Sequence, residues 1–293
     1  GLCLAQAWLD QGAPAPFTLA ELGPGRGTLM ADVLRATRGV PGFHAGMQVV
    51  LIEASARLRG VQRDRLAGVP VTWADSAADL PDLPLFLLAN EFFDALPIRQ
   101  FTRNGAGWRE TMVATAGDGL VRALGPVARI AALEDRLDEP PGAVVEICPA
   151  AAPVMAEIAD RICAHGGAAV VVDYGGWTSR GDTFQALRDH RFADPLAEPG
   201  LADLTAHVDF AALARAAAPA ASAFVTQGAL LSRLGIAARA ARLAAQLDGE
   251  RLAAHLAATR RLTDTAEMGS LFKALAIHPP ETRPPPGFET ETP

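Results

Sequence analysis

The chain has 293 residues, of which 50% are hydrophobic, and a formal net charge of −7. Its 26 Lys and Arg residues are scattered rather than clustered, so the sequence predicts no basic face for nucleic acid and suits a basic substrate better. No apolar run approaches the roughly 20 residues of a membrane span, and no signal-peptide pattern is present, so we expect a soluble protein without stable membrane insertion. We expect one large domain over residues 1–293.

The three cysteines, Cys3, Cys148 and Cys163, form neither a CxxC pair nor a Cys/His metal pattern. A small and odd number of cysteines favours a reducing compartment over a disulfide framework. We therefore interpret all three as packing residues and predict no metal site.

Residues 1–10 have the apolar rhythm of a helix, and a cluster of glycine and proline residues ends it. Because the sequence starts in that rhythm and without methionine, we expect it to begin inside a longer protein. Residues 17–34 then predict a buried strand, a glycine turn and a second helix.

The glycine turn contains Gly23, Gly25 and Gly27. Without Cβ atoms the backbone can turn sharply and lie against a ligand, with free N–H groups at the positive end of the helix. We expect a nucleotide-like ligand here. The alternative is that the glycines only allow close packing between strand and helix.

The spacing of these glycines differs from the dinucleotide fingerprint, because Thr28 holds the place of the third glycine. This weighs against a nicotinamide oxidoreductase. A Gly-x-Gly-x-Gly run preceded by an acid, Glu21, instead resembles the first motif of S-adenosylmethionine-dependent methyltransferases.

A second continuous apolar strand, residues 49–52, ends at Glu53. An acid at this point can accept both hydroxyls of a ribose, although it can equally be an exposed carboxylate before the next helix, 56–67. The short strand 71–75 follows, and its last residue, Asp75, could contact an adenine.

The strand at residues 85–89 is apolar throughout and runs into Asn90 and Glu91. Strands without alternation favour a parallel sheet covered by helices on both faces. The sequence therefore predicts an α/β fold of the Rossmann-like kind.

Residues 98–142 change character around Asn104-Gly105 and predict an inserted β-hairpin region. The α/β rhythm resumes with a strand at 144–149, a helix to about 164 and a strand at 168–172 that ends at Asp173. Residues 176–207 are the longest stretch without periodic structure, and we interpret them as an ordered lid-like loop.

The last third of the chain begins with a helix from about residue 210 and a strand near 223–226. We expect a helical insertion at 229–262, broken at Asp248-Gly249, and a final strand-like element at 268–277. The proline-rich tail at 278–293 is expected to extend over the surface.

Several stretches together resemble the MidA-like proteins, whose mitochondrial member is an arginine methyltransferase acting in assembly of respiratory complex I. The stretches are residues 21–28, 90–97, 173–175, 202–210 and 268–273. The resemblance covers nearly the whole chain, and the second and fourth stretches are particular to this family. It implies a class I methyltransferase fold, S-adenosyl-L-methionine as cofactor and a protein substrate with an exposed arginine. It also implies a region before Gly1 that helps to build the site.

We predict cofactor contacts near the carboxyl ends of the first four strands. These residues are Glu21, Gly23, Gly25, Gly27, Glu53, Asp75 and Asn90. Arginine is a poor nucleophile because its charge is delocalised and it stays protonated, and a carboxylate can both orient and polarise it.

Glu91 is our first candidate for the catalytic carboxylate, and Asp94 is the second. The alternative is that both acids cap a following helix, a role that fits Asp94 as well. His207 could accept a proton or orient an acid, although a lone histidine is more often structural. Asp173 could line the site without reacting.

These inferences lead to a methyltransferase that acts on a protein arginine, in a complex I subunit by family resemblance. A small-molecule methyltransferase and a non-catalytic assembly chaperone remain alternatives. We expect a cytoplasmic protein in a bacterium, or a matrix protein in a mitochondrion, and leave a homodimer open.

Overall fold

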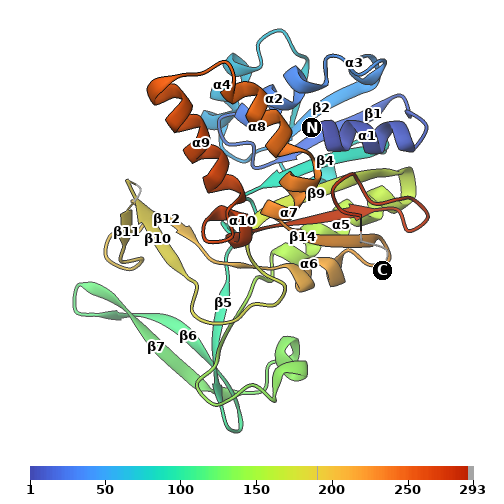
Figure 1. Ribbon diagram of the computed structural model, residues 1–293. Coiled ribbons are helices and arrows are strands. Elements are labelled where there is room, and N and C mark those ends of the chain that lie inside the picture. Colours follow the sequence, from blue (N-terminus) through green and yellow to red (C-terminus); the bar gives the residue numbers. More distant parts are fainter. Residues whose placement is uncertain (190, 290–293) are drawn as a thin grey trace. The chain divides into compact units, whose positions relative to one another are not determined.

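The computed structural model describes residues 1–189 and 191–289, and it contains two compact units (Figure 1). Unit 1 consists of Gly1–Phe92, Val154–Tyr174 and Leu213–Pro293, and unit 2 of Phe93–Pro153 and Gly175–Ala212. The chain therefore leaves unit 1 and returns to it twice.

Unit 1 is built on a mixed sheet with the strand order β14-β15-β9-β4-β1-β2-β3. The strands, in that order, are Ala221–Thr226, Phe272–His278, Gly167–Gly176, Leu85–Asn90, Phe17–Leu22, Met47–Ile52 and Val71–Ala74. Neighbours from β9 to β3 are parallel, whereas β15 is antiparallel to both β9 and β14. This arrangement confirms the predicted α/β class with a mostly parallel sheet.

The central strands are buried along their whole length. All six residues of β1 are buried, as are the first five of β4. A strand with no polar face needs cover on both sides, which is why these strands read as continuous apolar runs. The register pairs Leu22 with both Ile52 and Ala89, so β1, β2 and β4 end at one edge of the sheet.

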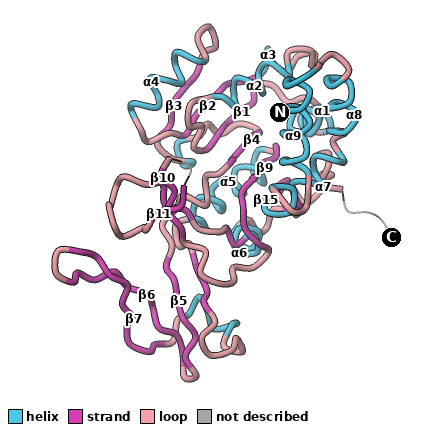
Figure 2. The backbone as a smooth tube through the Cα atoms, turned by 60° about the vertical axis from the view of Figure 1, so that its left-hand side comes forward, coloured by secondary structure: helices cyan, strands magenta, loops and turns pink. Residues whose placement is uncertain are grey.

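Helices separate the strands of this sheet along the chain, and four of them, α7 to α10, follow one another between β14 and β15. Figure 2 shows the helices in cyan and the strands in magenta. These helices are α1 Leu2–Asp10, α2 Thr28–Thr37, α3 Phe43–Gly46, α4 Ala56–Arg65, η1 Ala77–Asp79, α5 Ala151–His165, α6 Phe210–Ala216, α7 Gln227–Arg233, α8 Ile236–Ala244, α9 Gly249–Thr263 and α10 Met268–Leu271. Side chains cap the starts of α4, α6 and α7. Ser55 Oγ accepts from Leu58 N–H, Asp209 Oδ1 accepts from Ala212 N–H, and Thr226 Oγ1 accepts from Ala229 N–H.

Four aromatic rings from different elements meet in the core of unit 1. Trp8 and Phe43 contact edge to face at 5.2 Å between ring centroids, and Phe17 and Phe86 do so at 5.5 Å. None of these rings is more than 2% exposed, so each contributes roughly 2–3 kcal/mol by leaving water. This cluster packs α1 and α3 onto one face of the sheet.

Unit 2 contains a four-stranded antiparallel sheet with the order β7-β6-β5-β8. The strands are β5 Arg99–Asn104, β6 Gly107–Ala116, β7 Gly119–Ala128 and β8 Val144–Ile147, with η2 at Ala131–Arg136. The predicted hairpin is present, since Asn104 pairs with Gly107 across the turn. The placement of residues 144–149 in the parallel sheet was wrong, because β8 pairs with β5.

The segment 176–207 is not irregular throughout. It contains β10 Gln185–Arg188, β11 Arg191–Ala193 and β12 Asp203–Thr205, which form a small antiparallel sheet. Val208 and Asp209, as β13, then pair with the end of β9. The expectation of a stretch without periodic structure is corrected accordingly.

Two expectations for the C-terminal third also change. Residues 268–277 begin as the helical turn α10 before becoming β15, and Gly235 interrupts the helical region a second time. The part of the tail within the described residues does not lie extended on the surface, because Phe288 is 1% exposed. Residues 290–293 of the predicted tail lie outside the described residues.

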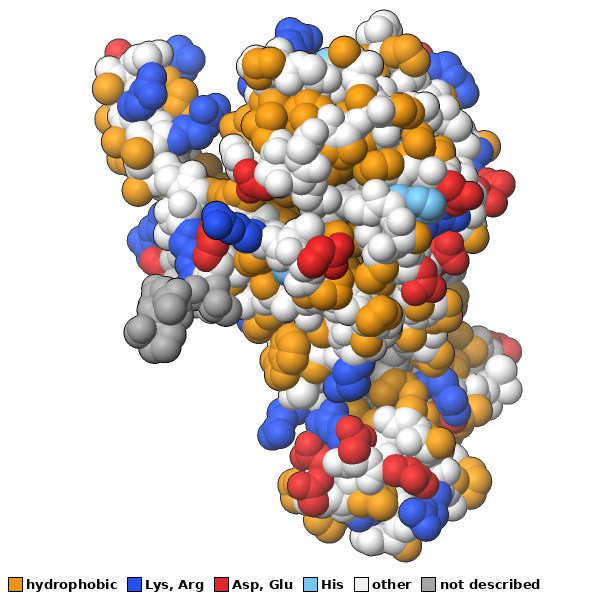
Figure 3. Space-filling view, turned by 90° about the vertical axis from the view of Figure 1, so that its right-hand side faces the viewer, with side chains coloured by type: hydrophobic (Ala, Val, Ile, Leu, Met, Phe, Trp, Pro, Cys, Tyr) orange, Lys and Arg blue, Asp and Glu red, His pale blue; other side chains and the backbone are white. Residues whose placement is uncertain are grey.

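On the face of the molecule shown in Figure 3, basic and acidic side chains are mixed. Among the helices of the described residues, none is both long and apolar enough to span a membrane.

Candidate active site

The glycine turn between β1 and α2 has the backbone that the sequence predicts. Gly23, Gly25 and Gly27 have φ values of +58°, +52° and +72°, in the left-handed region that favours glycine. A Cβ atom built on Gly25 would have no atom of the described residues within 4 Å, apart from its two chain neighbours. The loop therefore offers an open surface of backbone at the start of α2, where an anionic or polar ligand is favoured.

Glu21 lies just before this loop but faces the protein interior. Its side chain is 3% exposed, and its Oε2 has no hydrogen-bond partner among the described residues. Burial raises the pKa of its carboxyl from 4.5 to about 7, while a hydrogen bond from the Met30 backbone opposes the shift. Because Met30 lies in the first turn of α2, Glu21 links the strand to the helix that follows the loop.

Glu53 follows β2 at the same sheet edge and is 9% exposed. Its Oε1 accepts from Ser55 N–H at 2.8 Å, and its Oε2 accepts from Gln62 Nε2 at 3.1 Å. Each carboxylate oxygen can accept more than one hydrogen bond, so the group retains capacity for a ligand hydroxyl. Its two bonds hold it in one orientation.

Gln62, on α4, connects Glu53 to the glycine turn. Its Nε2 also donates to Gly25 O at 2.8 Å, and its Oε1 accepts from Trp73 Nε1 at 2.8 Å. The side chain is fully buried, so all of its polar atoms depend on these partners. One amide thus fixes the loop, the acid after β2 and the end of β3.

Asp75, the predicted adenine contact, follows β3 and pairs with Arg59 at 2.5 Å. Arg59 also donates from Nε to Glu53 O at 2.7 Å and from Nη2 to Ala74 O at 3.2 Å. The guanidinium therefore fastens the ends of β2 and β3 together. The Asp75 side chain remains 85% exposed.

Asn90 ends β4, and Glu91 follows it next to the glycine turn. Glu91 has φ +51°, which is uncommon for a residue with a side chain, and it is exposed. Its N–H donates to Val172 O at 3.0 Å, and Asn90 Nδ2 donates to Glu91 Oε1 at 3.1 Å. Such conformations persist where neighbours impose them, and they cluster at functional sites.

Phe92 joins the Glu91 turn to the glycine turn. A Cβ atom on Gly23 would lie 3.0 Å from Phe92 Cδ2, so the ring occupies the space that glycine leaves free. The two turns that carry left-handed residues therefore pack directly on each other.

Asp94 and His207 belong to unit 2, whereas Glu91 belongs to unit 1. Within unit 2 their segments meet: Ala206 N–H donates to Asp94 O at 3.0 Å, and His207 N–H donates to Thr183 Oγ1 at 2.8 Å. The helix-cap alternative for Asp94 and Glu91 is wrong, because a turn and then β5 follow them instead of a helix. Asp173 is fully buried within β9, opposite Lys273 of β15, and the strand continues beyond it to Gly176 instead of ending there.

Sequence reasoning missed Gln62 and Arg59. Both lie on α4, whose sequence ARLRGVQRDR is so polar that nothing marks which side chains turn inward. The one available signal is helical spacing, since residues 59 and 62 are three apart and share a face. Within residues 1–189 and 191–289, no group of three or more His, Cys, Asp or Glu side chains could hold a metal ion.

Comparison with known proteins places this geometry in a family. Residues 1–229 match a family model whose description names S-adenosyl-L-methionine-dependent methyltransferases. A crystal structure of a protein from Burkholderia thailandensis, described as a "likely methyl transferase" and bound to S-adenosyl-homocysteine, is 28% identical with a TM-score of 0.78. The likeness covers 98% of this chain and 75% of that one.

Relatives with curated names are called mitochondrial protein arginine methyltransferase NDUFAF7. The protein from Xenopus tropicalis is 36% identical over 263 residues, which is 80% of this chain and 61% of the relative. The Homo sapiens protein is 36% identical over 74% of this chain and 55% of its own length, and the Bos taurus protein is 33% identical over 95% and 70%. The chain thus spans about three fifths of the length of the frog relative.

Proposed function

This chain belongs to a family of S-adenosyl-L-methionine-dependent methyltransferases, and we propose that it transfers a methyl group to an arginine side chain of a protein. The observation that carries the proposal is Glu91, an exposed carboxylate held in a left-handed conformation beside the glycine turn. The names of the relatives, which are arginine methyltransferases, support the same choice of acceptor.

The residues at the sheet edge suit the cofactor of this family. The open backbone at Gly25 leaves room for a ligand to approach, and Glu53 has acceptor capacity for ribose hydroxyls. Gly23, Gly25, Gly27, Glu53, Asp75 and Asn90 are the residues that would hold it. When bound, S-adenosyl-L-methionine supplies an electrophilic methyl group on a sulfonium.

Glu21 is buried on the protein side of the turn, and we assign it an indirect role. It would set the position of α2 relative to β1, and hence of the loop between them. The exposed residues of the loop would make the direct contacts.

The proposed role of Glu91 is to bind and polarise the guanidinium that accepts the methyl group. A carboxylate forms two parallel hydrogen bonds with a guanidinium, which fixes its plane, and its charge draws the positive charge toward the bound nitrogens. The remaining nitrogen keeps more lone-pair density and can attack the methyl carbon. Asn90 supports this role by donating to Glu91 Oε1 and limiting its rotation.

Asp94 and His207 are the proposed second acid and the proposed proton acceptor. The guanidinium must lose one proton after the new N–C bond forms, and imidazole is suited to take it near neutral pH. The hydrogen bond from Ala206 N–H to Asp94 O brings their segments together in unit 2.

We further propose a subunit of respiratory complex I as the substrate, following the family resemblance. A cytoplasmic location in a bacterium, or the matrix in a mitochondrion, follows from that choice. A homodimer stays a prediction.

A comparison of the native host with and without this protein tests the proposal. Mass spectrometry should find an arginine whose methylation disappears in the deletion strain and returns with the full-length gene. Return of the methyl group with a Glu91→Gln gene at a normal level would remove Glu91 from the mechanism. If no methylarginine changes but a small methylated metabolite does, the acceptor is a small molecule.

A further inference from the structure

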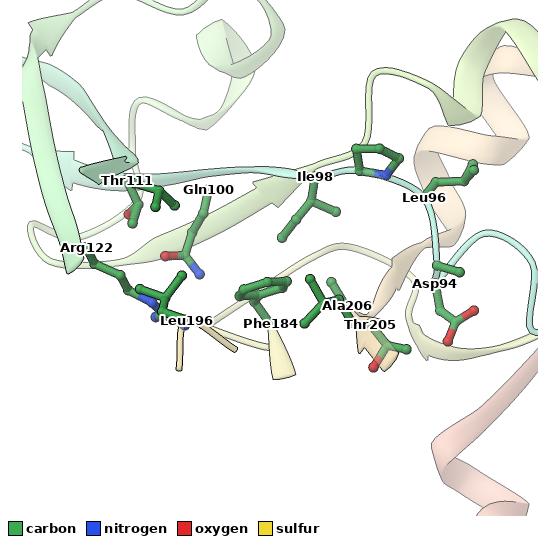
Figure 4. A pocket seen from close by; sticks show the side chains of 14 residues that line it. Asp94, Leu96, Ile98, Gln100, Thr111, Arg122, Phe184, Leu196, Thr205 and Ala206 are labelled. Carbon is green, nitrogen blue, oxygen red and sulfur yellow. The ribbon is translucent and has the colours of Figure 1, made fainter. Parts of the chain in front are cut away.

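A cavity of about 360 Å³ lies within unit 2. Its walls come from the segment that follows Asp94, from the β6–β7 hairpin and from residues 184–206 (Figure 4). Figure 4 shows Ile98 and Phe184 facing each other in the middle, with Arg122 and Gln100 at one end and Asp94 at the other. Most of the lining is aliphatic or aromatic.

The polar groups at the Arg122 end are already engaged with protein partners. Gln100 Nε2 donates to Asp182 Oδ1 at 2.8 Å and to Glu146 Oε1 at 3.0 Å. Arg122 Nη1 donates to Asp182 Oδ2 at 2.7 Å, and its guanidinium lies 5.7 Å from the Phe184 ring centroid. The one charged side chain that lines this end, Arg122, is therefore already paired with Asp182.

The Phe184 wall is fixed from behind by a buried carboxylate. Glu146, 2% exposed, accepts from Thr183 N–H at 3.0 Å, from Phe184 N–H at 3.1 Å and from the Thr183 hydroxyl. Charge-assisted bonds of this kind are strong in a buried setting. These hydrogen bonds fix the backbone at Thr183 and Phe184, so this wall of the cavity has a defined position.

The Thr205 side chain also lines the cavity. The Thr205 hydroxyl is buried and has no hydrogen-bond partner among the described residues. An occupant that supplies a donor or acceptor beside an apolar group would satisfy it, and a peptide backbone carries both.

We propose that this cavity binds one large apolar side chain of the protein substrate, from the segment that flanks the methylated arginine. The proposal rests on the proposed function. Its support is the apolar lining, the pairing of Arg122 with Asp182, and the Thr205 hydroxyl, which has no partner among the described residues. The chain adds a further argument, because the first lining residue, Asp94, is three residues after Glu91.

The test measures peptide binding directly. Fluorescein-labelled peptides carry one central arginine in a glycine–serine background, with a single leucine at successive positions on either side. Anisotropy is read with the full-length protein and saturating S-adenosylhomocysteine. Leucine at one favoured position should tighten binding about tenfold over the leucine-free peptide, the typical gain from burying such a side chain.

A matched pair of variants places the effect in the cavity. Leu204 lines it and is 44% exposed, whereas Leu201 is 55% exposed and lies outside it. Leu204→Glu should remove the gain from leucine, and Leu201→Glu should keep it. Both positions are exposed enough for the fold to tolerate the charge.

The remaining outcomes distinguish failure of the cavity proposal from failure of the proposed function. If leucine gives no gain at any position, or if both variants behave alike, the cavity is not a side-chain site, whether or not arginine is methylated. If leucine peptides bind as expected but none is methylated, the cavity assignment stands and the proposed function fails. If Leu204→Glu instead dissociates a dimer in light scattering, the occupant is a second copy and the proposal is overturned.

Discussion

Replacing Gln62 by Leu should lower both the stability of unit 1 and the affinity for the cofactor, although every predicted cofactor residue stays unchanged. The side chain is fully buried and makes three hydrogen bonds, to Gly25 O, to Glu53 Oε2 and from Trp73 Nε1. Leucine has a similar volume but can make none of them. The substitution therefore leaves three buried polar groups with fewer partners.

The magnitude follows from the kind of each bond. The two neutral bonds are worth about 1 kcal/mol each, and the bond to the Glu53 carboxylate about 1.5–3 kcal/mol. Their loss should lower the free energy of unfolding of unit 1 by about 4 kcal/mol, which corresponds to a fall of about 10 °C in Tm. The affinity for S-adenosylhomocysteine should also fall, by at least about tenfold, because Gly25 and Glu53 lose a common support.

The assay combines differential scanning calorimetry with titration calorimetry at a temperature where the variant is fully folded. Arg65→Leu is the matched control, since Arg65 lies on the same helix and is exposed. A variant with a lower Tm but normal cofactor affinity would show that Gln62 only supports the fold. Unchanged values for both quantities would refute the reasoning altogether.

Three further predictions concern the same sheet edge. Gly25→Val should abolish cofactor binding, since a branched side chain would fill the open space above the loop and strain a backbone at φ +52°; retained affinity would place the cofactor elsewhere. Glu91→Gln should lower the single-turnover rate about a hundredfold with Tm and cofactor affinity nearly unchanged, because the exposed side chain caps no helix; a normal rate would contradict it. Because the pKa of Glu21 is raised, between pH 4.5 and about 7 the folded protein keeps a proton on this carboxyl that the unfolded chain has lost. The stability that Glu21 contributes is therefore lost as pH rises through that window. The free energy of unfolding of Glu21→Gln, measured in urea, should therefore rise relative to that of the wild type by on the order of 3 kcal/mol between pH 5 and pH 8. Parallel curves of this free energy against pH would argue against a raised pKa.

The elements that place the site could be predicted because their patterns are local. Continuous apolar runs at residues 49–52 and 85–89 mark buried strands wherever they occur, and the residues that follow parallel strands share one edge. The glycine turn at Gly23 was visible for the same reason. Its three positive φ values agree with the backbone freedom that the pattern indicated.

The errors arose where the partner of a segment decides its structure. Val144–Ile147 has the same apolar pattern in either sheet, and only its pairing with Arg99–Asn104 assigns it to unit 2. The strands β10 to β12 have three or four residues each, too few to show alternation. Phe288 is a lone aromatic among prolines, and its burial depends on contacts remote in sequence.

The same limit applied to the candidate site. Helical spacing shows that Gln62 and Arg59 share a face of their helix, but it does not show that this face turns inward or which groups the two side chains contact. The burial of Glu21 likewise depends on how α2 packs against β1. The roles of Glu91, Asp94 and His207 stay predictions until turnover is measured.

The interleaving of the two units determines the order in which the sheet can be completed on the ribosome. β4 is buried in the finished sheet between β1 and β9, but the chain builds part of unit 2 between Asn90 and Gly167 before β9 exists. At about 5–20 residues per second, that apolar strand edge stays open for roughly 4–15 s. An unpaired edge of this kind is a template for pairing with another chain, and the arrival of β9 removes it.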